Sequence, residues 1–355
     1  MLHKHLIAIL LASGAFTASA AVEWLGDVHD FGAFSEDDGD ATCRFAMVNL
    51  GPDPVALTSV RASCGCTTPS YSRDPIMPGD TAYVDVRYNP IGRPGAFDKK
   101  IYVNLSDKSE RQTLTIKGSV IGSARTMQAR FPVDAGSLKL SNSAVAFGDV
   151  AKTRSKSTYF KIYNASPDTL TPGWGQLPPY LRVTATDPVI LPGEQNTYVF
   201  TVIGDQSPDY GFVSDTLMIQ PAPGVEPYPL EVMAMFTEDF SQMTPGQRIN
   251  APHVGLETES VDFGTFDPAA DKLMARFTIT NTGENPLKIR RVYSADRGIE
   301  LKIDKTTIKK GKKAEVTVTV VPSQLTEEIL NSRAVIISND PDNPVAVVRL
   351  VGFPK

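Results

Sequence analysis

Hydrophobic and polar residues alternate over short stretches of this chain, and the apolar positions are rich in β-branched and aromatic types. The clearest runs lie at residues 83–88, 198–202 and 316–320, and each of them follows a turn that contains glycine. Shorter runs of the same kind lie at residues 114–116, 230–232 and 347–350. Alternation with this period puts one face of a strand in a core and the other in water. The pattern therefore predicts an all-β protein.

A repeat is visible in the spacing of these runs. A Phe-Gly pair stands at residues 31–32, 147–148 and 263–264, so that successive pairs are 116 residues apart. Downstream of each pair, a strand-like run ends at an asparagine turn that begins at Asn49, Asn164 or Asn281. Short strands and frequent turns in units of this length predict three tandem immunoglobulin-like β-sandwich domains.

The repeat also sets the predicted domain boundaries. The expected order is a signal peptide (1–20), domain 1 (21–122), a linker (123–142), domain 2 (143–236), a linker (237–256) and domain 3 (257–355). The two connecting segments lack a strand period, so we interpret them as linkers or edge strands. Residues 323–331 have the only helix-like pattern, which favours one or two turns at most.

The first twenty residues have the three parts of a secretory leader. A basic start is followed by an apolar run at residues 6–12 and by small residues at 18–20, which predicts cleavage between Ala20 and Ala21. The apolar run is shorter than the ~20 residues that span a bilayer. We therefore expect a bacterial protein exported to the periplasm or the extracellular medium, not membrane-spanning once mature, in a compartment where disulfides persist.

The balance of charges narrows the range of partners. The chain has 35 basic and 40 acidic residues, a formal net charge of −5. A nucleic-acid binder needs a basic face for the phosphates, so we expect no nucleic acid among the partners.

Two of the three cysteines lie close together, in the sequence Ser-Cys-Gly-Cys-Thr at residues 63–67. The surrounding sequence resembles a bacterial secreted family catalogued as domain of unknown function 1573. Five ordered blocks carry the resemblance, at residues 45–51, 54–57, 63–67, 75–79 and 95–101. The resemblance covers residues 28 to 120 and implies an immunoglobulin-like fold, similar to major-sperm-protein and ciliary repeat domains, with no assigned activity. The second and third modules resemble the family only in fold and turn pattern.

The cysteines themselves allow three interpretations. In the first, Cys43 pairs with Cys64 or Cys66 across the sandwich, a structural staple that would stabilise the module by about 3 kcal/mol, or the thiols are simply buried. In the second, Cys64 and Cys66 form a disulfide across Gly65 that exchanges with Cys43 or with a thiol of a partner.

In the third, Cys64 and Cys66 bind a soft metal ion such as Cu(I), with Cys43, Met47 or Met77 as further ligands. Copper is thus the one cofactor that the sequence suggests. Three sulfurs cannot close a four-cysteine zinc site.

Catalytic patterns are missing from the sequence. Only His29 and His253 remain once the leader is removed, and no Gly-x-Ser-x-Gly or phosphate-binding loop is present. We therefore predict a protein that is not an enzyme and that acts as a structural or protein-binding module on an unknown protein or cell-envelope component. The alternative is a thiol-redox or copper-binding protein that uses Cys64 and Cys66.

Overall fold

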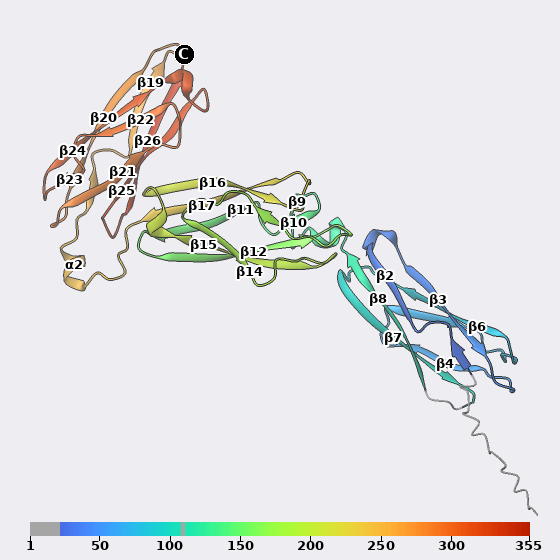
Figure 1. Cartoon of the computed structure of the whole chain (residues 1–355). Helices are drawn as coiled ribbons and strands as arrows, with labels where there is room; N and C mark the ends of the chain where they lie inside the picture. The colour runs from blue at the N-terminus through green and yellow to red at the C-terminus, as the bar shows by residue number, and fades with distance from the viewer. Residues whose placement is uncertain (1–21, 108–110) are drawn as a thin grey trace, which may run out of the picture. The chain divides into compact units, whose positions relative to one another are not determined.

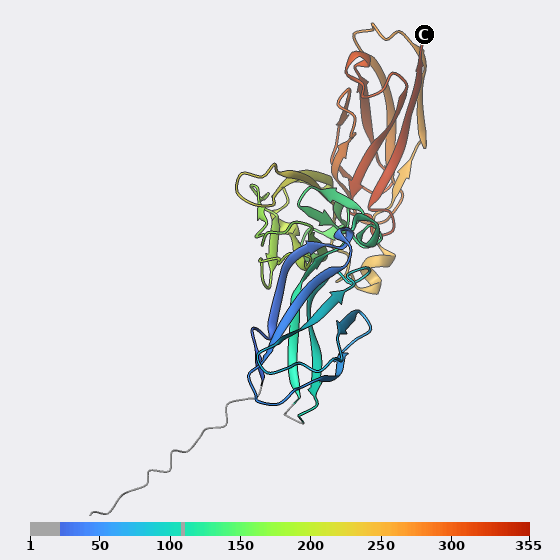
Figure 2. The same cartoon turned by 90° about the vertical axis from the view of Figure 1, so that its right-hand side faces the viewer.

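The computed structural model describes residues 22–107 and 111–355, and its regular secondary structure is mostly β-strand. Six sheets pair into three sandwiches, and each sandwich encloses its own hydrophobic cluster (Figures 1 and 2). The all-β immunoglobulin-like fold predicted from the alternation is confirmed. The predicted leader lies outside the described residues.

The chain divides into two compact units. One comprises the residues up to Met127 with two short segments, 165–168 and 191–194, and the other comprises the rest. The first sandwich lies in the first unit. One of its sheets has the order β1 (Val22–Trp24), β3 (Ala41–Asn49), β6 (Thr81–Tyr88), β5 (Thr67–Tyr71). The other has the order β2 (Val28–Ser35), β8 (Gln112–Ile121), β7 (Gly95–Leu105), β4 (Leu57–Ala62).

The second unit contains the other two sandwiches. One sheet of the second sandwich has the order β14 (Leu181–Ala185), β15 (Gln195–Ile203), β12 (Ser155–Asn164), β10 (Leu138–Leu140), β9 (Val133–Ala135). Its other sheet has the order β11 (Ala144–Ala151), β17 (Tyr228–Thr237), β16 (Gly211–Gln220), β13 (Gly173–Trp174). One sheet of the third sandwich has the order β18 (Val254–Leu256), β20 (Leu273–Asn281), β24 (Lys313–Val320), β22 (Ile299–Ile303). Its other sheet has the order β19 (Ser260–Phe266), β26 (Val345–Pro354), β25 (Leu330–Ser338), β21 (Leu287–Tyr293), β23 (Thr307–Ile308).

The segments between the sandwiches were interpreted from the sequence as linkers or edge strands, and they contain β9 and β18, which are edge strands of their sheets. Helical structure in the described residues is limited to short elements. The helices are α1 (Ala124–Met127) and α2 (Pro245–Ile249), and the 3-10 turns are η1 (Glu36–Asp38), η2 (Gly204–Gln206) and η3 (Pro322–Gln324). The segments 123–142 and 237–256 contain β9, β10 and β18, which are strands of the adjoining sheets. Three residues are too few for alternation to reveal a strand. The helix-like stretch 323–331 begins inside η3 and forms no α-helix.

Each Phe-Gly pair forms a bulge in a strand that runs parallel to the last strand of its sandwich. The register of the β2–β8 pair shifts between Asp30 and Ala33, and the β11–β17 and β19–β26 pairs shift at the same place. Gly32 has φ +65° there, a conformation that glycine adopts without strain. The backbone N–H of Gly32 donates a hydrogen bond of 2.9 Å to the Asp30 carboxylate. The sequence repeat is therefore a repeat of backbone geometry.

The asparagine at each turn is fully buried, and its side chain is hydrogen-bonded to a backbone carbonyl in every case. Asn49 Nδ2 donates to the carbonyl oxygens of Asp53 and Ile76, both at 2.9 Å. Asn281 Nδ2 makes the equivalent bonds to Asn285 at 2.8 Å and Ile308 at 2.9 Å. Buried amides need such partners, and in the first and third sandwiches they tie two loops together at one end.

Candidate functional site

The Cys-Gly-Cys loop crosses from one sheet of the first sandwich to the other. It follows β4 and precedes β5. At its start, Ser63 N donates to the carbonyl oxygen of Lys100 on β7 at 2.8 Å, and Ser63 Oγ accepts from Lys100 N at 3.2 Å. At its end, Asn89 N donates to the carbonyl oxygen of Cys66 at 2.9 Å. Backbone hydrogen bonds to both sheets therefore hold the loop, independently of the sulfurs.

Cys64 and Cys66 are joined to each other by a disulfide, with their Cα atoms 5.4 Å apart. The predicted staple from Cys43 to either of them is not formed. The sheet order gives the reason, because Cys43 on β3 lies opposite Val86 on β6, which lies opposite Pro69 on β5. Two strand spacings are about 9.6 Å, beyond the reach of a disulfide. Sequence spacing could not reveal the strand that lies between them.

The two sulfurs have different surroundings. Cys66 packs against the hydrophobic cluster of the first sandwich and precedes Thr67, which is 4% exposed. Cys64 does not pack on that cluster, although both cysteines are half-buried, and a Cβ added at Gly65 would meet no atom within 4 Å. The hydroxyl of Thr67 lies 3.7 Å from the sulfur of Cys64 and 3.8 Å from that of Cys66. One polar group thus contacts both sulfurs at a partly accessible loop.

Cys43 has no disulfide partner and packs against the same cluster. Burial, with a contribution from the negative charge of Asp85, raises the pKa of its thiol to about 11. A thiol must ionise to attack a disulfide or to bind a soft metal. Cys43 therefore remains protonated near neutral pH and is a poor exchange partner or ligand.

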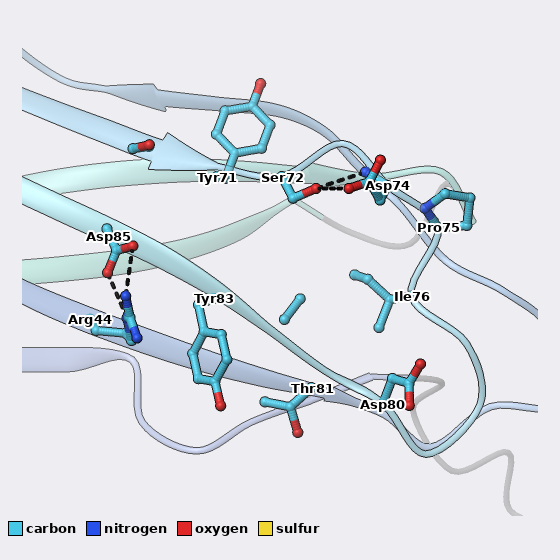
Figure 3. Close-up of a pocket in the computed structure, with 12 residues that line it drawn as sticks. Arg44, Tyr71, Ser72, Asp74, Pro75, Ile76, Asp80, Thr81, Tyr83 and Asp85 are labelled. Atoms are coloured by element: carbon cyan, nitrogen blue, oxygen red, sulfur yellow. Dashed lines mark hydrogen bonds and ion pairs between the residues drawn. The ribbon is translucent and has the colours of Figure 1, made fainter.

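The outer face of the β3–β6–β5 sheet carries a second candidate site, which the sequence prediction did not include. Alternation directs Arg44, Tyr83 and Asp85 away from the core. Arg44 makes two hydrogen bonds to the Asp85 carboxylate, of 2.6 and 3.1 Å, and lies over the Tyr83 ring at 4.9 Å (Figure 3). The ion pair lowers the pKa of Asp85, so its carboxylate is ionised under ordinary conditions.

Two grooves adjoin this ion pair. The first has a volume of about 480 Å³ and is the one drawn in Figure 3. Its lining includes Arg44, Ser70, Tyr71, Ser72, Asp74, Pro75, Ile76, Asp80, Thr81, Ala82, Tyr83 and Asp85. The second is lined by Thr42, Cys43, Arg44, Thr68, Ser70, Asp85, Val86 and Arg87. Alternation could have identified the outward side chains, but only the register shows that they lie side by side.

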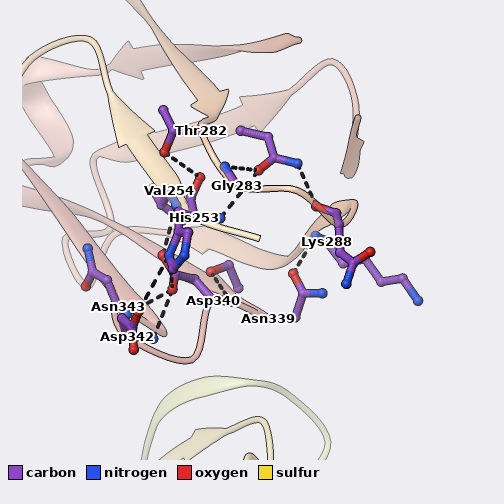
Figure 4. A network of polar contacts seen from close by, with 12 residues as sticks. His253, Val254, Thr282, Gly283, Lys288, Asn339, Asp340, Asp342 and Asn343 are labelled. Carbon is purple, nitrogen blue, oxygen red and sulfur yellow. Dashed lines mark hydrogen bonds and ion pairs between the residues drawn. The ribbon is translucent and has the colours of Figure 1, made fainter. Parts of the chain in front are cut away.

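A polar network in the third sandwich contains the one group of three metal-ligand types within residues 22–107 and 111–355, namely His253, Asp340 and Asp342 (Figure 4). His253 Nδ1 lies 3.4 Å from Asp340 Oδ1 and 3.7 Å from Asp342 Oδ2. Asp340 is buried and accepts hydrogen bonds from the backbone N–H groups of Val254, Asp342 and Asn343. These three bonds explain why the Asp340 carboxylate is buried: it supports the turn between β25 and β26.

No helix in the described part of the chain is long and apolar enough to cross a membrane. His29, the other histidine beyond the predicted leader, packs edge-on against Phe31 at a centroid distance of 4.5 Å. It is not in the metal-ligand group of the third sandwich.

Comparison with known proteins identifies the family. The family model described as Protein of unknown function (DUF1573) matches residues 22–120 and 254–352, together more than half of the chain. The resemblance inferred from the sequence is thereby confirmed. Its predicted extent was too narrow, because the third module matches the same model as the first although it lacks the cysteines.

Several solved structures are similar in fold. A protein of unknown function from Porphyromonas gingivalis W83 is 18% identical, with a TM-score of 0.49, over 61% of this chain and 100% of that one. The titin I-band fragment I67–I69 is 11% identical, with a TM-score of 0.27, over 95% of this chain and 100% of the fragment. The seventh PapD-like domain of human CEP192 is 12% identical, with a TM-score of 0.26, over 35% of this chain and 98% of that domain. Curated proteins offer no match to the chain.

Proposed function

The chain belongs to the DUF1573 family of proteins of unknown function, and from this premise we propose that it is an exported, non-enzymatic binding protein that captures a protein partner through its first sandwich. The observation that carries the proposal is the grooved outer face of the β3–β6–β5 sheet, with the Arg44–Asp85 pair and Tyr83 between and beside the grooves. Tyrosine and arginine are the residue types that dominate binding energy at protein interfaces.

The ion pair is suited to this role because it is weak and accessible. The side chains of Arg44 and Asp85 are 59% and 51% exposed. Exposed pairs contribute about 1 kcal/mol or less to folding, so a partner can replace either half of the pair at little cost. Hydroxyl groups of Thr42, Ser70 and Tyr83 surround it and supply hydrogen bonds of adaptable direction.

The sheet face is a better binding surface here than the sheet edge. Among described strands, β5 pairs with β6 alone and is therefore an edge strand. Pro69 stands in its middle and offers no N–H to an added strand. Its counterparts β14 and β22 lack proline. Strand addition at β5, the edge beside the grooves, is therefore disfavoured, and side-chain recognition is the mechanism we propose.

Site-specific photocrosslinking in the producing cell tests the proposal. A photoreactive phenylalanine derivative replaces Tyr83 in one strain and Tyr159 in another. Tyr159 is a matched control, because it is 74% exposed and lies on β12 of the second sandwich. We expect a discrete adduct from position 83 alone, and its loss when Arg44→Glu is added. Identical adducts from both positions, or none from position 83, would contradict the proposal.

Export is the second part of the proposed function. We expect the leader to be removed and the mature chain to begin at Ala21, outside the cytoplasm. Cell fractionation with intact mass measurement checks this. Recovery of the full-length chain from the cytoplasmic fraction would refute it and leave the binding face untouched.

A further inference from the structure

We propose that Cys64 and Cys66 form a redox pair that exchanges electrons with a dithiol of another protein, with Cys64 forming the mixed disulfide and Cys66 resolving it. This activity goes beyond partner capture, because it uses the crossover loop and not the grooved sheet face. Four observations on the described residues carry it.

The disulfide does not join separate elements of the sandwich. It closes a segment of three residues, 64–66, between β4 and β5. The hydrogen bonds from Ser63 to Lys100 and from Asn89 to Cys66 hold the loop on both sheets. Reduction would therefore leave the fold intact, which a reversible redox site requires and a structural staple does not.

The two cysteines are not equivalent. Both are half-buried, but only Cys66 packs on the hydrophobic cluster, whereas Cys64 lies beside the exposed Gly65. In thiol–disulfide exchange, access decides which sulfur is attacked. The outer sulfur is then the one that meets a partner, and the sulfur anchored on the core resolves the intermediate.

The register of β4 and β7, continued past its last pair, points to a lysine opposite the outer sulfur. Ala62 lies opposite Ile101, and the hydrogen bond from Ser63 N to the Lys100 carbonyl extends the ladder by one pair. The next pair would be Cys64 and Lys99, both half-buried and on the same face. Cβ atoms of opposite residues are about 5 Å apart, within reach of a lysine ammonium, and a nearby cation favours the thiolate.

Thr67 and Cys43 complete the arrangement. The Thr67 hydroxyl lies within 3.8 Å of both sulfurs and can donate to whichever becomes a thiolate. Cys43 holds its proton and lies two strands from β5, so it does not compete for the mixed disulfide. The pair therefore acts without a third cysteine of its own chain.

The proposed reaction balances as follows. A thiolate of the partner dithiol attacks the sulfur of Cys64, the Cys64–Cys66 bond breaks, and Cys66 leaves as a thiolate that takes a proton from water. The second partner thiol loses its proton and attacks the partner sulfur of the mixed disulfide, and Cys64 leaves as a thiolate. Cys64 takes up the proton that the second partner thiol lost, so the pair ends as two thiols while the partner gives up two electrons and becomes a disulfide. In the reverse direction the Cys64 thiolate attacks a partner disulfide, and Cys66 resolves the mixed disulfide by attacking Cys64 and releasing the partner thiolate.

Single-cysteine variants of the full chain test the assignment. Cys43→Ser is placed in every variant, and Cys66→Ser or Cys64→Ser is added. With oxidised glutathione as the probe, we expect the Cys66→Ser variant to form the mixed disulfide about tenfold faster than the Cys64→Ser variant. Equal rates, or faster modification of Cys66, would overturn the assigned roles.

Lys99 is tested as a positioning residue in the Cys66→Ser background. Lys99→Met should slow the reaction at pH 7 by about threefold or more and move its pH profile to higher pH. Lys100→Met is the matched control, since Lys100 is the next residue of β7 and bonds to Asp98 and Thr115 on the outer face. Equal profiles for the two lysine variants would remove Lys99 from the proposal.

A redox titration of the unaltered protein tests the activity itself. In mixtures of reduced and oxidised dithiothreitol, the Cys64–Cys66 bond should open and reform while hydrogen exchange of the first sandwich stays unchanged. Reduction that occurs only together with unfolding would show a structural bond and sink the redox proposal. The crosslink from Tyr83 reports on partner capture separately, so failure of one proposal is distinguishable from failure of the other.

Discussion

Glu36 shows how a single acidic residue can act as a structural anchor. Its carboxylate, in η1, is 6% exposed and accepts hydrogen bonds from Gly92 N at 2.6 Å, Ser123 N at 3.0 Å and Thr126 Oγ1 at 2.9 Å. Burial opposes the charge, but these donors outweigh it, so that the pKa of Glu36 lies below its ordinary value of 4.5. The ionised form is thus the one that the first unit requires.

The sign of the pH dependence follows from this lowered pKa. A carboxyl whose pKa is lower in the folded state stabilises the fold above its unfolded pKa and loses that effect as the pH falls. We expect Glu36→Gln to reduce the free energy of unfolding by about 1–3 kcal/mol at pH 7. The free energy of unfolding of the variant should also decrease less than that of the unaltered protein as the pH drops below 4.5. Urea denaturation at pH 7 and pH 4 measures both. Asp37→Asn, at an exposed neighbour, is the control and should change neither; equal effects would contradict the anchor.

What single residues do could be read from the sequence only in part. The turn asparagines and the glycines of the Phe-Gly pairs were recognisable because each requires a particular backbone or hydrogen-bonding environment. The partner of each cysteine was not, since residue types do not specify how many strands separate two positions. The Arg44–Asp85 pair joins residues 41 positions apart and became visible only with the register.

At the scale of elements, the Cys-Gly-Cys loop should contribute little to stability. Cross-linking stabilises a fold by an amount that grows with the length of the closed loop, and three residues correspond to about 1.5 kcal/mol. The staple predicted at first would have contributed about twice as much. We therefore expect the Cys64→Ser/Cys66→Ser double variant to lose about 1.5 kcal/mol or less in urea denaturation. A loss above about 3 kcal/mol would mean that the bond does join separate elements.

A glycine in the β2 bulge should matter more for stability than the glycine of the Cys-Gly-Cys loop. Gly32 has φ +65° in the parallel β2–β8 pair, where a side chain adds strain of about 1–2 kcal/mol. Gly65 has space around it and no such backbone conformation. Gly32→Ala should therefore destabilise the first sandwich by about 1 kcal/mol or more, and Gly65→Ala should be nearly neutral. Hydrogen exchange of β2 and β8 measures the difference, and equal protection in the two variants would refute it.

Elements were predictable where they are long enough to alternate. Several strands of eight or more residues that line the cores, among them β6, β15 and β24, were visible as periodic runs, because burial of one face imposes a period of two. The strands β7, β16 and β25 are as long but were not identified. The three-residue strands β9, β10 and β18 were not, since their pairing comes from the neighbouring strand and not from their own composition.

At the scale of the whole molecule, the same buried turn asparagine recurs in sandwiches with separate cores. The first and third sandwiches match one family model, and their hydrophobic clusters share no residue. Asn49 and Asn281 make equivalent bonds in each, and their Oδ1 atoms accept from Gly51 N and Gly283 N, both at 3.0 Å. The repetition of a buried amide with the same partners indicates a requirement of the fold itself and not of the cysteine loop, which occurs once.

Two independent cores predict additive effects. Asn49→Ala and Asn281→Ala each leave buried carbonyl groups without a donor, at a cost of about 2 kcal/mol, which corresponds to about thirtyfold faster exchange of the protected amides of that sandwich. In hydrogen exchange of the full chain, each change should appear only in its own sandwich, and the double variant should equal the sum within about 0.5 kcal/mol. Asn104→Ala, at an exposed position of β7, is the control. Because the two amides share no partner, any coupling well above that margin would show that the sandwiches unfold together and that the chain, not the sandwich, is the cooperative unit.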